Sequence, residues 1–176
     1  MARLSDVKGH KYLIEAMKPV LELYPDVQLL IAGEGKMEKE LKRLTESLNI
    51  KKSVFFMPVA LDTRVILSAI DIFVMPSLKE GLGLALMEAM ACGLAVIGSR
   101  VGGIKTLIIE GKNGLLFEPA DTQGLKEAIL TLLADPEKRE ALAREANEFI
   151  TKNFSKDKMV LETERVYLDI INERAG

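Results

Sequence analysis

The chain has 176 residues, 48% of them hydrophobic, which is enough to bury one good core and too few for two. Its formal net charge is −2 and charges of both signs are mixed along it, so a nucleic-acid-binding surface is not expected. No apolar run is long enough to span a bilayer and the N-terminus does not resemble a signal peptide, which favours a cytoplasmic protein without a transmembrane segment.

The chain contains one cysteine and one histidine, so a metal centre built from these two residue types is not expected. Cys92 falls on a helix with an apolar pattern and has no second cysteine for a disulfide. We therefore expect it to be a small core residue rather than a nucleophile. His10 is expected at the start of a helix.

Apolar runs and helical patterns alternate along the chain. In order, the sequence predicts a helix at His10–Leu23, a strand at Val27–Ala32, a helix at Met37–Leu48, a strand at Ser53–Met57, a helix at Arg64–Ala69 and a strand at Asp71–Met75. A helix after Gly83 is followed by strands at Leu94–Gly98 and Leu115–Phe117 and by helices at Thr122–Ala134, Glu137–Asn153 and Lys156–Glu173. This alternation predicts an α/β fold, a doubly wound parallel sheet whose ligands bind at the carboxyl ends of the strands.

The stretch from Glu80 to Gly93 has the strongest functional pattern, because it leads from a buried strand through a glycine-rich turn into an apolar helix. Gly81 and Gly83 allow close approach of the backbone to a ligand, and the free N–H groups at the helix start favour an anion such as phosphate. Glu88 is the only charge in the helix, which is costly unless it is paired or lines a cleft. Glu80 could instead favour the helix N-terminus, and Glu88 could form a structural ion pair.

Several segments resemble motifs of the family 4, GT-B type glycosyltransferases. The string from Pro76 through Glu80-Gly81-Leu82-Gly83-Leu84 to Glu88 is similar to the family's E-x7-E signature. The segment Arg3-Leu-Ser-Asp-Val-Lys8-Gly9 resembles its G-R-L-x-x-x-K-G segment, Ile31-Ala-Gly33-Glu34-Gly35 its V-G-x-G loop, and Gly102-Gly103 its G-G loop. The resemblance implies a Rossmann-like domain, one half of a GT-B fold.

The resemblance also implies roles for these residues. Arg3 and Lys8 would hold the diphosphate of a nucleotide-sugar donor and neutralise charge on the leaving phosphate, and with Glu80 they form the expected catalytic set. Glu80 would contact hydroxyls of the donor sugar and Glu88 the ribose diol. The remaining expected donor-binding residues are Gly33, Gly35, Gly81, Leu82, Gly83, Leu84, Gly102 and Gly103. The alternative for Arg3 and Lys8 is that both are ordinary solvated side chains.

The sequence departs from the family pattern at several places. Ala95 stands where proline is usual, Lys105-Thr106 where Pro-Glu is usual, and Ala2 where glycine precedes the arginine. Pro58 stands in a region near the nucleotide base where glycine is common, and proline has no N–H to offer a base edge. The base, whether uracil, guanine or another, is left open by these residues.

The resemblance covers residues 1–176 as a C-terminal, nucleotide-sugar-binding domain only. The acceptor domain and the strand that should precede Arg3 are missing, so we expect a fragment of a longer protein. In a doubly wound sheet that strand is central, and its loss would leave unpaired edges or require a neighbouring segment to close the gap. In this family the last helix crosses back onto the other domain, which predicts an exposed apolar stripe of Val160, Leu161, Val166, Tyr167 and Ile170; otherwise these side chains pack on their own domain.

The function implied is donor binding within a retaining, hexosyltransferase-type enzyme that transfers a sugar from a nucleoside-diphosphate sugar. No cofactor or metal is implied, and this chain alone would be inactive. The acceptor, a sugar or a lipid-linked glycan, would bind through the missing domain. Two alternatives stay open: a nucleotide-sugar-binding module or subunit without turnover, and a GT-B-like nucleotide-sugar epimerase.

Overall fold

The computed structural model describes residues 2–58 and 62–175, with side chains up to Asn172. Met1, which the sequence alone could not establish as a native start, lies outside the described residues. The elements are η1 (Asp6–Lys8), α1 (His10–Leu23), β1 (Leu29–Ala32), α2 (Glu38–Ser47), η2 (Lys51–Ser53), β2 (Val54–Met57), α3 (Thr63–Leu67), β3 (Ile72–Met75), α4 (Leu84–Ala91), β4 (Ala95–Ser99), α5 (Ile104–Leu107), β5 (Leu115–Phe117), α6 (Thr122–Ala134), α7 (Pro136–Asn153) and α8 (Lys156–Ala175). Each predicted strand and helix is present close to its expected bounds.

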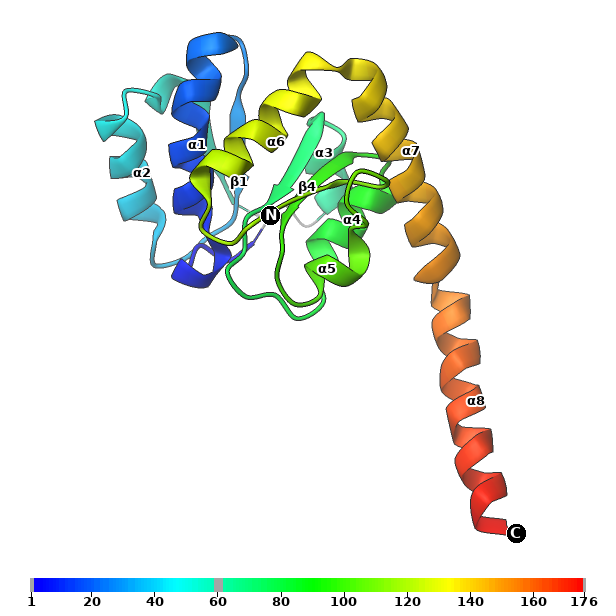
Figure 1. Cartoon of the computed structure of the whole chain (residues 1–176). Helices are drawn as coiled ribbons and strands as arrows, with labels where there is room; N and C mark the ends of the chain where they lie inside the picture. The colour runs from blue at the N-terminus through cyan, green and yellow to red at the C-terminus, as the bar shows by residue number, and fades with distance from the viewer. Residues whose placement is uncertain (1, 59–61, 176) are drawn as a thin grey trace.

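Helices cover both faces of the parallel strands, as the alternating pattern predicts (Figure 1). Strand β4 is buried along its whole length, and its residues alternate between two cores. Ala95 and Ile97 pack with α1 and α6, whereas Val96 packs with α4 and α5. Because successive strand residues point to opposite faces, the apolar run of β4 is the signature of a strand buried on both sides. The α/β, Rossmann-like fold is thus confirmed.

The parallel strands form two sheets rather than one. β1 pairs with β2, and β3, β4 and β5 pair in that order. Within residues 2–58 and 62–175, no strand pairs with the second edge of β1 or of β3. The split falls at the position that the central strand holds in a 3-2-1-4-5-6 sheet, and the described residues place no strand there.

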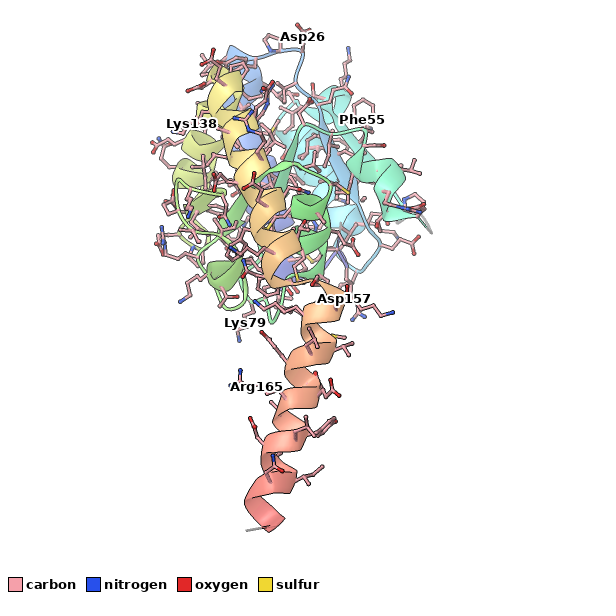
Figure 2. The ribbon with its side chains drawn as sticks, turned by 90° about the vertical axis from the view of Figure 1, so that its right-hand side faces the viewer. Asp26, Phe55, Lys79, Lys138, Asp157 and Arg165 are labelled. Carbon is pink, nitrogen blue, oxygen red and sulfur yellow. The ribbon has the colours of Figure 1, made fainter. Side chains whose placement is uncertain are left out.

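Helix α8 extends away from the rest of the chain (Figures 1 and 2). The apolar stripe expected on it is exposed, with 44–64% of each side chain accessible at Val160, Leu161, Val166, Tyr167 and Ile170. The alternative that these side chains pack on their own domain is therefore wrong. In the described part of the chain, no helix combines the length and the apolar character needed to cross a bilayer.

Helix α4 is only partly buried, although its composition is apolar. Leu86, Ala89 and Met90 are buried, but Leu84 is 64% exposed and Glu88 is also exposed. Residues four apart lie on one helical face, so α4 has a narrow solvent-facing stripe despite its apolar composition.

The prediction that Cys92 is a core residue is wrong, because this cysteine is exposed. It lies just after the last turn of α4 and its N–H donates to the carbonyl of Glu88. The prediction was based on the apolar composition of the helix, but Cys92 lies four residues after Glu88 and continues the exposed stripe of Leu84 and Glu88.

Candidate functional site

The glycine-rich loops meet at the carboxyl ends of the strands. Figure 2 shows in which direction the strands run. Asp26, which precedes β1, and Lys79, which follows β3, lie at opposite ends of the domain. Helix α8 leaves the body on the side of Lys79. Because all paired strands are parallel, the segments after β1, β3 and β4 share one edge, and the N-terminal segment of residues 2–9 joins them there.

Lys8 and Glu80 form an ion pair at this edge. The distance from Lys8 Nζ to Glu80 Oε2 is 2.6 Å, and the two side chains are 23% and 14% exposed. Residues 72 apart in sequence therefore meet in a partly desolvated position, where an ion pair is stronger than at the surface. Of the three expected catalytic residues, the structure brings these two together.

Two serines hold the loop that carries Glu80. The hydroxyl of buried Ser77 donates to Glu80 Oε2 at 3.3 Å. The hydroxyl of buried Ser99, at the end of β4, donates to the carbonyl of Ser77. Glu80 thus accepts hydrogen bonds from two side chains, and its orientation is fixed from β3 and β4 together.

The N-terminal segment is held against the same loop by its backbone. The N–H of Leu78 donates to the carbonyl of Val7 at 2.7 Å. Gly9 has a φ of +66°, and a Cβ at this position would overlap the carbonyl oxygen of Pro76. Gly9 is therefore required both for its left-handed backbone and for close contact with the β3 loop, which together place Lys8 opposite Glu80.

The start of α4 offers unused N–H groups beside the ion pair. Gly83 is the N-cap with a φ of +76° and has no side chain to cap the helix. Within the described residues, the N–H groups of Leu82, Gly83, Leu84 and Ala85 donate no hydrogen bond. These donors and the helix dipole favour an anion, and Gly81 leaves open space beside them, with nothing within 4 Å of the position of a Cβ.

Gly102 and Gly103 pack directly against the backbone of the Glu80 loop. A Cβ on Gly102 would overlap the carbonyl oxygen of Glu80, and a Cβ on Gly103 would overlap that of Gly81. The N–H of Gly103 already donates to the carbonyl of Glu80 at 3.1 Å. The structure gives both glycines a packing role, and their expected contact with a ligand stays a prediction.

A hollow of about 490 Å³ lies beside the β1 loop, lined by Gly33, Gly35, Met57 and Pro58 among others. The N–H of Gly33 donates to the carbonyl of Met57 at 2.9 Å, and a Cβ on Gly33 would overlap the carbonyl oxygen of Ala2. Close packing of the N-terminal segment on this loop requires glycine here. The hollow is large enough for a small-molecule ring system.

Arg3 and Glu88 do not join the ion pair. Arg3 is exposed, and its neighbours Ala2 and Leu4 place it beside the β1 loop through backbone bonds to Ala32 and Glu34. Within the described residues neither Arg3 nor Glu88 has an ion-pair partner. The interpretation of Glu88 as part of a structural ion pair is therefore wrong, because this carboxylate is solvated.

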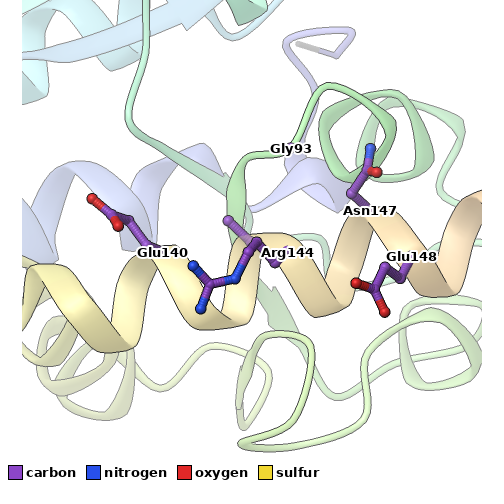
Figure 3. A pocket seen from close by; sticks show the side chains of 6 residues that line it. Gly93, Glu140, Arg144, Asn147 and Glu148 are labelled. Atoms are coloured by element: carbon purple, nitrogen blue, oxygen red, sulfur yellow. The ribbon is translucent and has the colours of Figure 1, made fainter.

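A second hollow, of about 420 Å³, does not belong to this site. Figure 3 shows it beside α7, lined by Glu140, Arg144, Asn147 and Glu148 together with Gly93. Gly93 precedes β4, so this hollow adjoins the amino end of a strand. Asn147 donates to the carbonyl of Ala91 at 2.7 Å, which assigns it to closing the end of α4.

His10 lies close to the site, at the start of α1, as the sequence predicts. The sequence did not predict the surroundings of its side chain. His10 is 8% exposed, and its Nδ1 has no hydrogen-bond partner among the described residues. Burial lowers the pKa of His10 to about 4, and the positive charge of Lys8 adds to the effect. The imidazole is therefore neutral in the folded protein near pH 7.

Acid is expected to destabilise the fold through His10. The unfolded imidazole binds a proton below pH 6.5 and the folded one only below about 4, so stability is lost as the pH falls between these values. His10→Gln cannot titrate, and the difference in unfolding free energy between parent and variant should change by about 3 kcal/mol over this range. Urea denaturation from pH 7 to pH 4 measures it; parallel pH profiles would contradict the assignment.

Comparison with known proteins identifies the family. The sequence model of the family described as "Glycosyl transferases group 1" matches residues 1–149, well over half of the chain. The chain belongs to the glycosyl transferases group 1 family. The resemblance to glycosyltransferases is thus confirmed at the level of group 1, and assignment to family 4 stays a prediction.

Group 1 relatives match in sequence and structure. N-acetyl-alpha-D-glucosaminyl L-malate synthase of Bacillus anthracis is 34% identical over 148 residues, which cover 84% of this chain and 39% of that protein. HepE of Anabaena, solved in complex with UDP, has a TM-score of 0.90 and 26% identity over 96% of this chain and 47% of HepE. The C-terminal domain of the group 1 protein LpcC from Francisella tularensis has a TM-score of 0.82 and 30% identity over 89% of this chain and 84% of that domain. The chain spans less than half of the full-length relatives it matches here.

Proposed function

We propose that this chain is the C-terminal, donor-binding domain of a retaining glycosyltransferase of family 4. The observation that carries the proposal is the Lys8–Glu80 ion pair beside the unused N–H groups at the start of α4. A cation, a fixed carboxylate and free amides at one edge match the diphosphate and sugar hydroxyls of a nucleotide sugar. The family supports this assignment, and the UDP complex of HepE supports a nucleotide as the ligand.

In this proposal each charged group binds a different part of the nucleotide-sugar donor. Lys8 and Arg3 bind the diphosphate and stabilise the charge that develops on it as the sugar departs. Glu80 accepts hydrogen bonds from hydroxyls of the sugar, and its bonds to Lys8 and Ser77 hold it in place before the donor arrives. Glu88, solvated in the free chain, accepts hydrogen bonds from the ribose diol.

The glycine-rich loops supply the remaining contacts. The amides from Gly81 to Leu84 face the sugar and diphosphate, with the Gly102–Gly103 turn behind them. The hollow at Gly33, Gly35 and Pro58 holds the nucleotide base. Contact with the base at Pro58 is through its ring or carbonyl, because proline has no N–H to donate.

The transfer reaction is proposed for the longer protein. Its acceptor binds on a second domain, and the exposed apolar stripe of α8 is the surface that meets that domain. Transfer of a hexose with retention, without a metal, is part of the proposal. A cytoplasmic location also stays a prediction. The present chain is expected to bind the donor without transferring the sugar.

Calorimetric titration of the chain with UDP, GDP and ADP tests the proposal. We expect selective binding of one nucleotide. The double variant Arg3→Ala, Lys8→Ala should weaken this binding at least tenfold, and Glu88→Ala should also weaken it, because the contact with the ribose is lost. Glu137→Ala on the outer surface of α7 serves as the control and should bind like the parent. Equal binding by all variants, or no binding by a folded chain, would contradict the proposed site.

Gly103→Ala is expected to weaken binding of the selected nucleotide by roughly tenfold. The added Cβ overlaps the carbonyl oxygen of Gly81 and must displace the loop that carries Glu80 and the free amides. Gly93→Ala is the control outside the site, because nothing lies within 4 Å of its Cβ position and it precedes β4 at the other end of the strands. An equal or smaller loss for Gly103→Ala than for Gly93→Ala, measured by calorimetry, would show that loop position does not govern binding.

A further inference from the structure

One polar residue ends the buried apolar run of β4. The strand has the sequence Ala-Val-Ile-Gly-Ser, and all of its residues are buried. Ser99, the last of them, is 0% exposed, so its hydroxyl has no contact with bulk water. A buried hydroxyl without a hydrogen bond would destabilise the fold, and Ser99 instead donates to the carbonyl of Ser77. The bond links the end of β4 to the segment that follows β3.

This bond lies where the backbone ladder between β3 and β4 stops. Met75 and Gly98 are the last residues paired between these strands. Pro76 comes next in the β3 segment and has no N–H to donate, so it cannot extend the ladder as a donor. The Ser99 side chain makes the next connection, at Ser77. A strand buried on both faces thus fixes the first residues of the loop that follows β3.

Ser77 extends this connection to Glu80. Its side chain is almost inaccessible to solvent, because the residue is 1% exposed. The Ser77 hydroxyl donates to Glu80 Oε2 at 3.3 Å. Each serine has a single O–H proton, so the two bonds use both donors and form a chain from β4 to the carboxylate. A bond lost from this chain is not replaced by bulk solvent.

The hydrogen bonds to the Glu80 carboxylate reach one of its two oxygens. Lys8 Nζ and Ser77 Oγ both donate to Oε2, at 2.6 and 3.3 Å. Among the residues whose side chains the structure describes, none donates to Oε1. An ionised carboxylate accepts hydrogen bonds at both oxygens. The protein therefore holds one oxygen of Glu80 and leaves the other for a ligand.

We propose that Ser99 is a positioning residue for the donor sugar and acts through Ser77 on the orientation of Glu80. The serine chain holds Oε2, and Oε1 accepts hydrogen bonds from hydroxyls of the sugar. The inference rests on the proposed function, because Glu80 contacts a sugar only if the chain binds a nucleotide-sugar donor. It gives Ser99 an effect on the binding of the sugar and not on the binding of the nucleotide.

The sugar contact is measured by a ratio of two dissociation constants, that of the nucleoside-diphosphate sugar divided by that of the nucleoside diphosphate. Calorimetry is carried out with UDP, GDP and ADP, and then with the glucose, galactose and mannose derivatives of the nucleotide that binds. The sugar whose ratio rises most in Glu80→Ala is the probe. Ser99→Ala should raise the ratio for this probe roughly fivefold and change the Kd of the nucleotide less than twofold.

Two further variants test whether Ser99 acts through Glu80. The void left by Ser99→Ala is smaller than the volume of about 30 Å³ that a water occupies, so no water restores the lost bond. Ser77→Ala removes the next bond of the chain and should raise the ratio by a similar factor. In the Glu80→Ala background, Ser99→Ala should have no further effect on the ratio, because the carboxylate that it positions is absent. A general loss of stability would not produce this coupling.

Thr45 provides a matched control at the other end of the strands. It is a buried residue in the last turn of α2, and its hydroxyl donates to the carbonyl of Lys42 at 2.7 Å. Thr45→Val removes this bond and keeps the shape of the side chain, so the melting temperature should fall about as much as in Ser99→Ala. The ratio should stay within twofold of the parent value. Circular dichroism verifies that each variant is folded.

The outcomes separate this inference from the proposed function. Absence of binding with all three nucleotides contradicts the proposed function and the inference with it. Normal nucleotide binding, with a ratio raised by Glu80→Ala but by neither serine variant, overturns the inference alone. A further rise from Ser99→Ala in the Glu80→Ala background, or an equal rise in Thr45→Val, also overturns it. A ratio that Glu80→Ala leaves unchanged for all three sugars removes the contact on which the role of Ser99 depends and overturns the inference as well.

Discussion

Gly9→Ala is expected to lower the free energy of unfolding by about 3–5 kcal/mol. The left-handed φ of +66° costs an alanine about 1–2 kcal/mol, and overlap of its Cβ with the carbonyl oxygen of Pro76 adds an overpacking cost of similar or larger size. For a chain of this length the melting temperature should fall by roughly 10 °C. Thermal and urea denaturation measure both values.

Gly93→Ala and Gly111→Ala are the matched controls for this prediction. Their φ angles are +74° and +70°, close to that of Gly9, but nothing lies within 4 Å of their Cβ positions. Each should lose only about 1–2 kcal/mol. The difference from Gly9→Ala isolates the contact between the N-terminal segment and the β3 loop; equal losses at all three positions would mean that this contact is not formed.

Lys8→Met is expected to weaken nucleoside-diphosphate binding by roughly ten- to hundredfold. The substitution removes a cation from the proposed diphosphate site and leaves the Glu80 carboxylate, 14% exposed, without its partner at 2.6 Å. The unpaired carboxylate then repels the diphosphate. Adding Glu80→Gln to Lys8→Met should therefore recover part of the affinity, and calorimetry of the two single variants and the double variant measures the coupling.

Lys51→Met is the control that removes an ion pair outside the proposed site. Lys51 lies 2.6 Å from Glu46, the same separation as in the Lys8–Glu80 pair, but both side chains are more than half exposed and precede β2 at the other end of the sheet. Its effect on nucleotide binding should be less than twofold. Independent effects of Lys8 and Glu80, with no coupling between them, would contradict the role given to their ion pair.

The order of elements could be predicted from the sequence because the local signals agree with the tertiary structure. The apolar run of β4 indicates burial on both faces, and packing on two cores is what the structure shows. The split between β1 and β3 was also predictable, because in the 3-2-1-4-5-6 strand order these two strands are not neighbours.

Side-chain environments were less predictable. The glycines at positions 102 and 103 suggest ligand contact in sequence, but in the structure both accommodate the backbone of the Glu80 loop. Glu88 and Cys92 are exposed although α4 is apolar, because composition does not reveal which narrow face of a helix is left uncovered. The neutral state of His10 depends on burial by distant elements, which no local pattern reports.

The location of the donor site can be tested most directly through the glycine amides in a ¹⁵N-correlated NMR spectrum. Millimolar UDP, with GDP and ADP for comparison, should shift the signals of Gly81, Gly83 and Gly35 for one of the three nucleotides. The signals of Gly93 and Gly111, at the amino ends of β4 and β5, should stay in place. Unchanged signals with all three nucleotides, or shifts confined to Gly93 and Gly111, would contradict a donor site at the carboxyl ends of the strands.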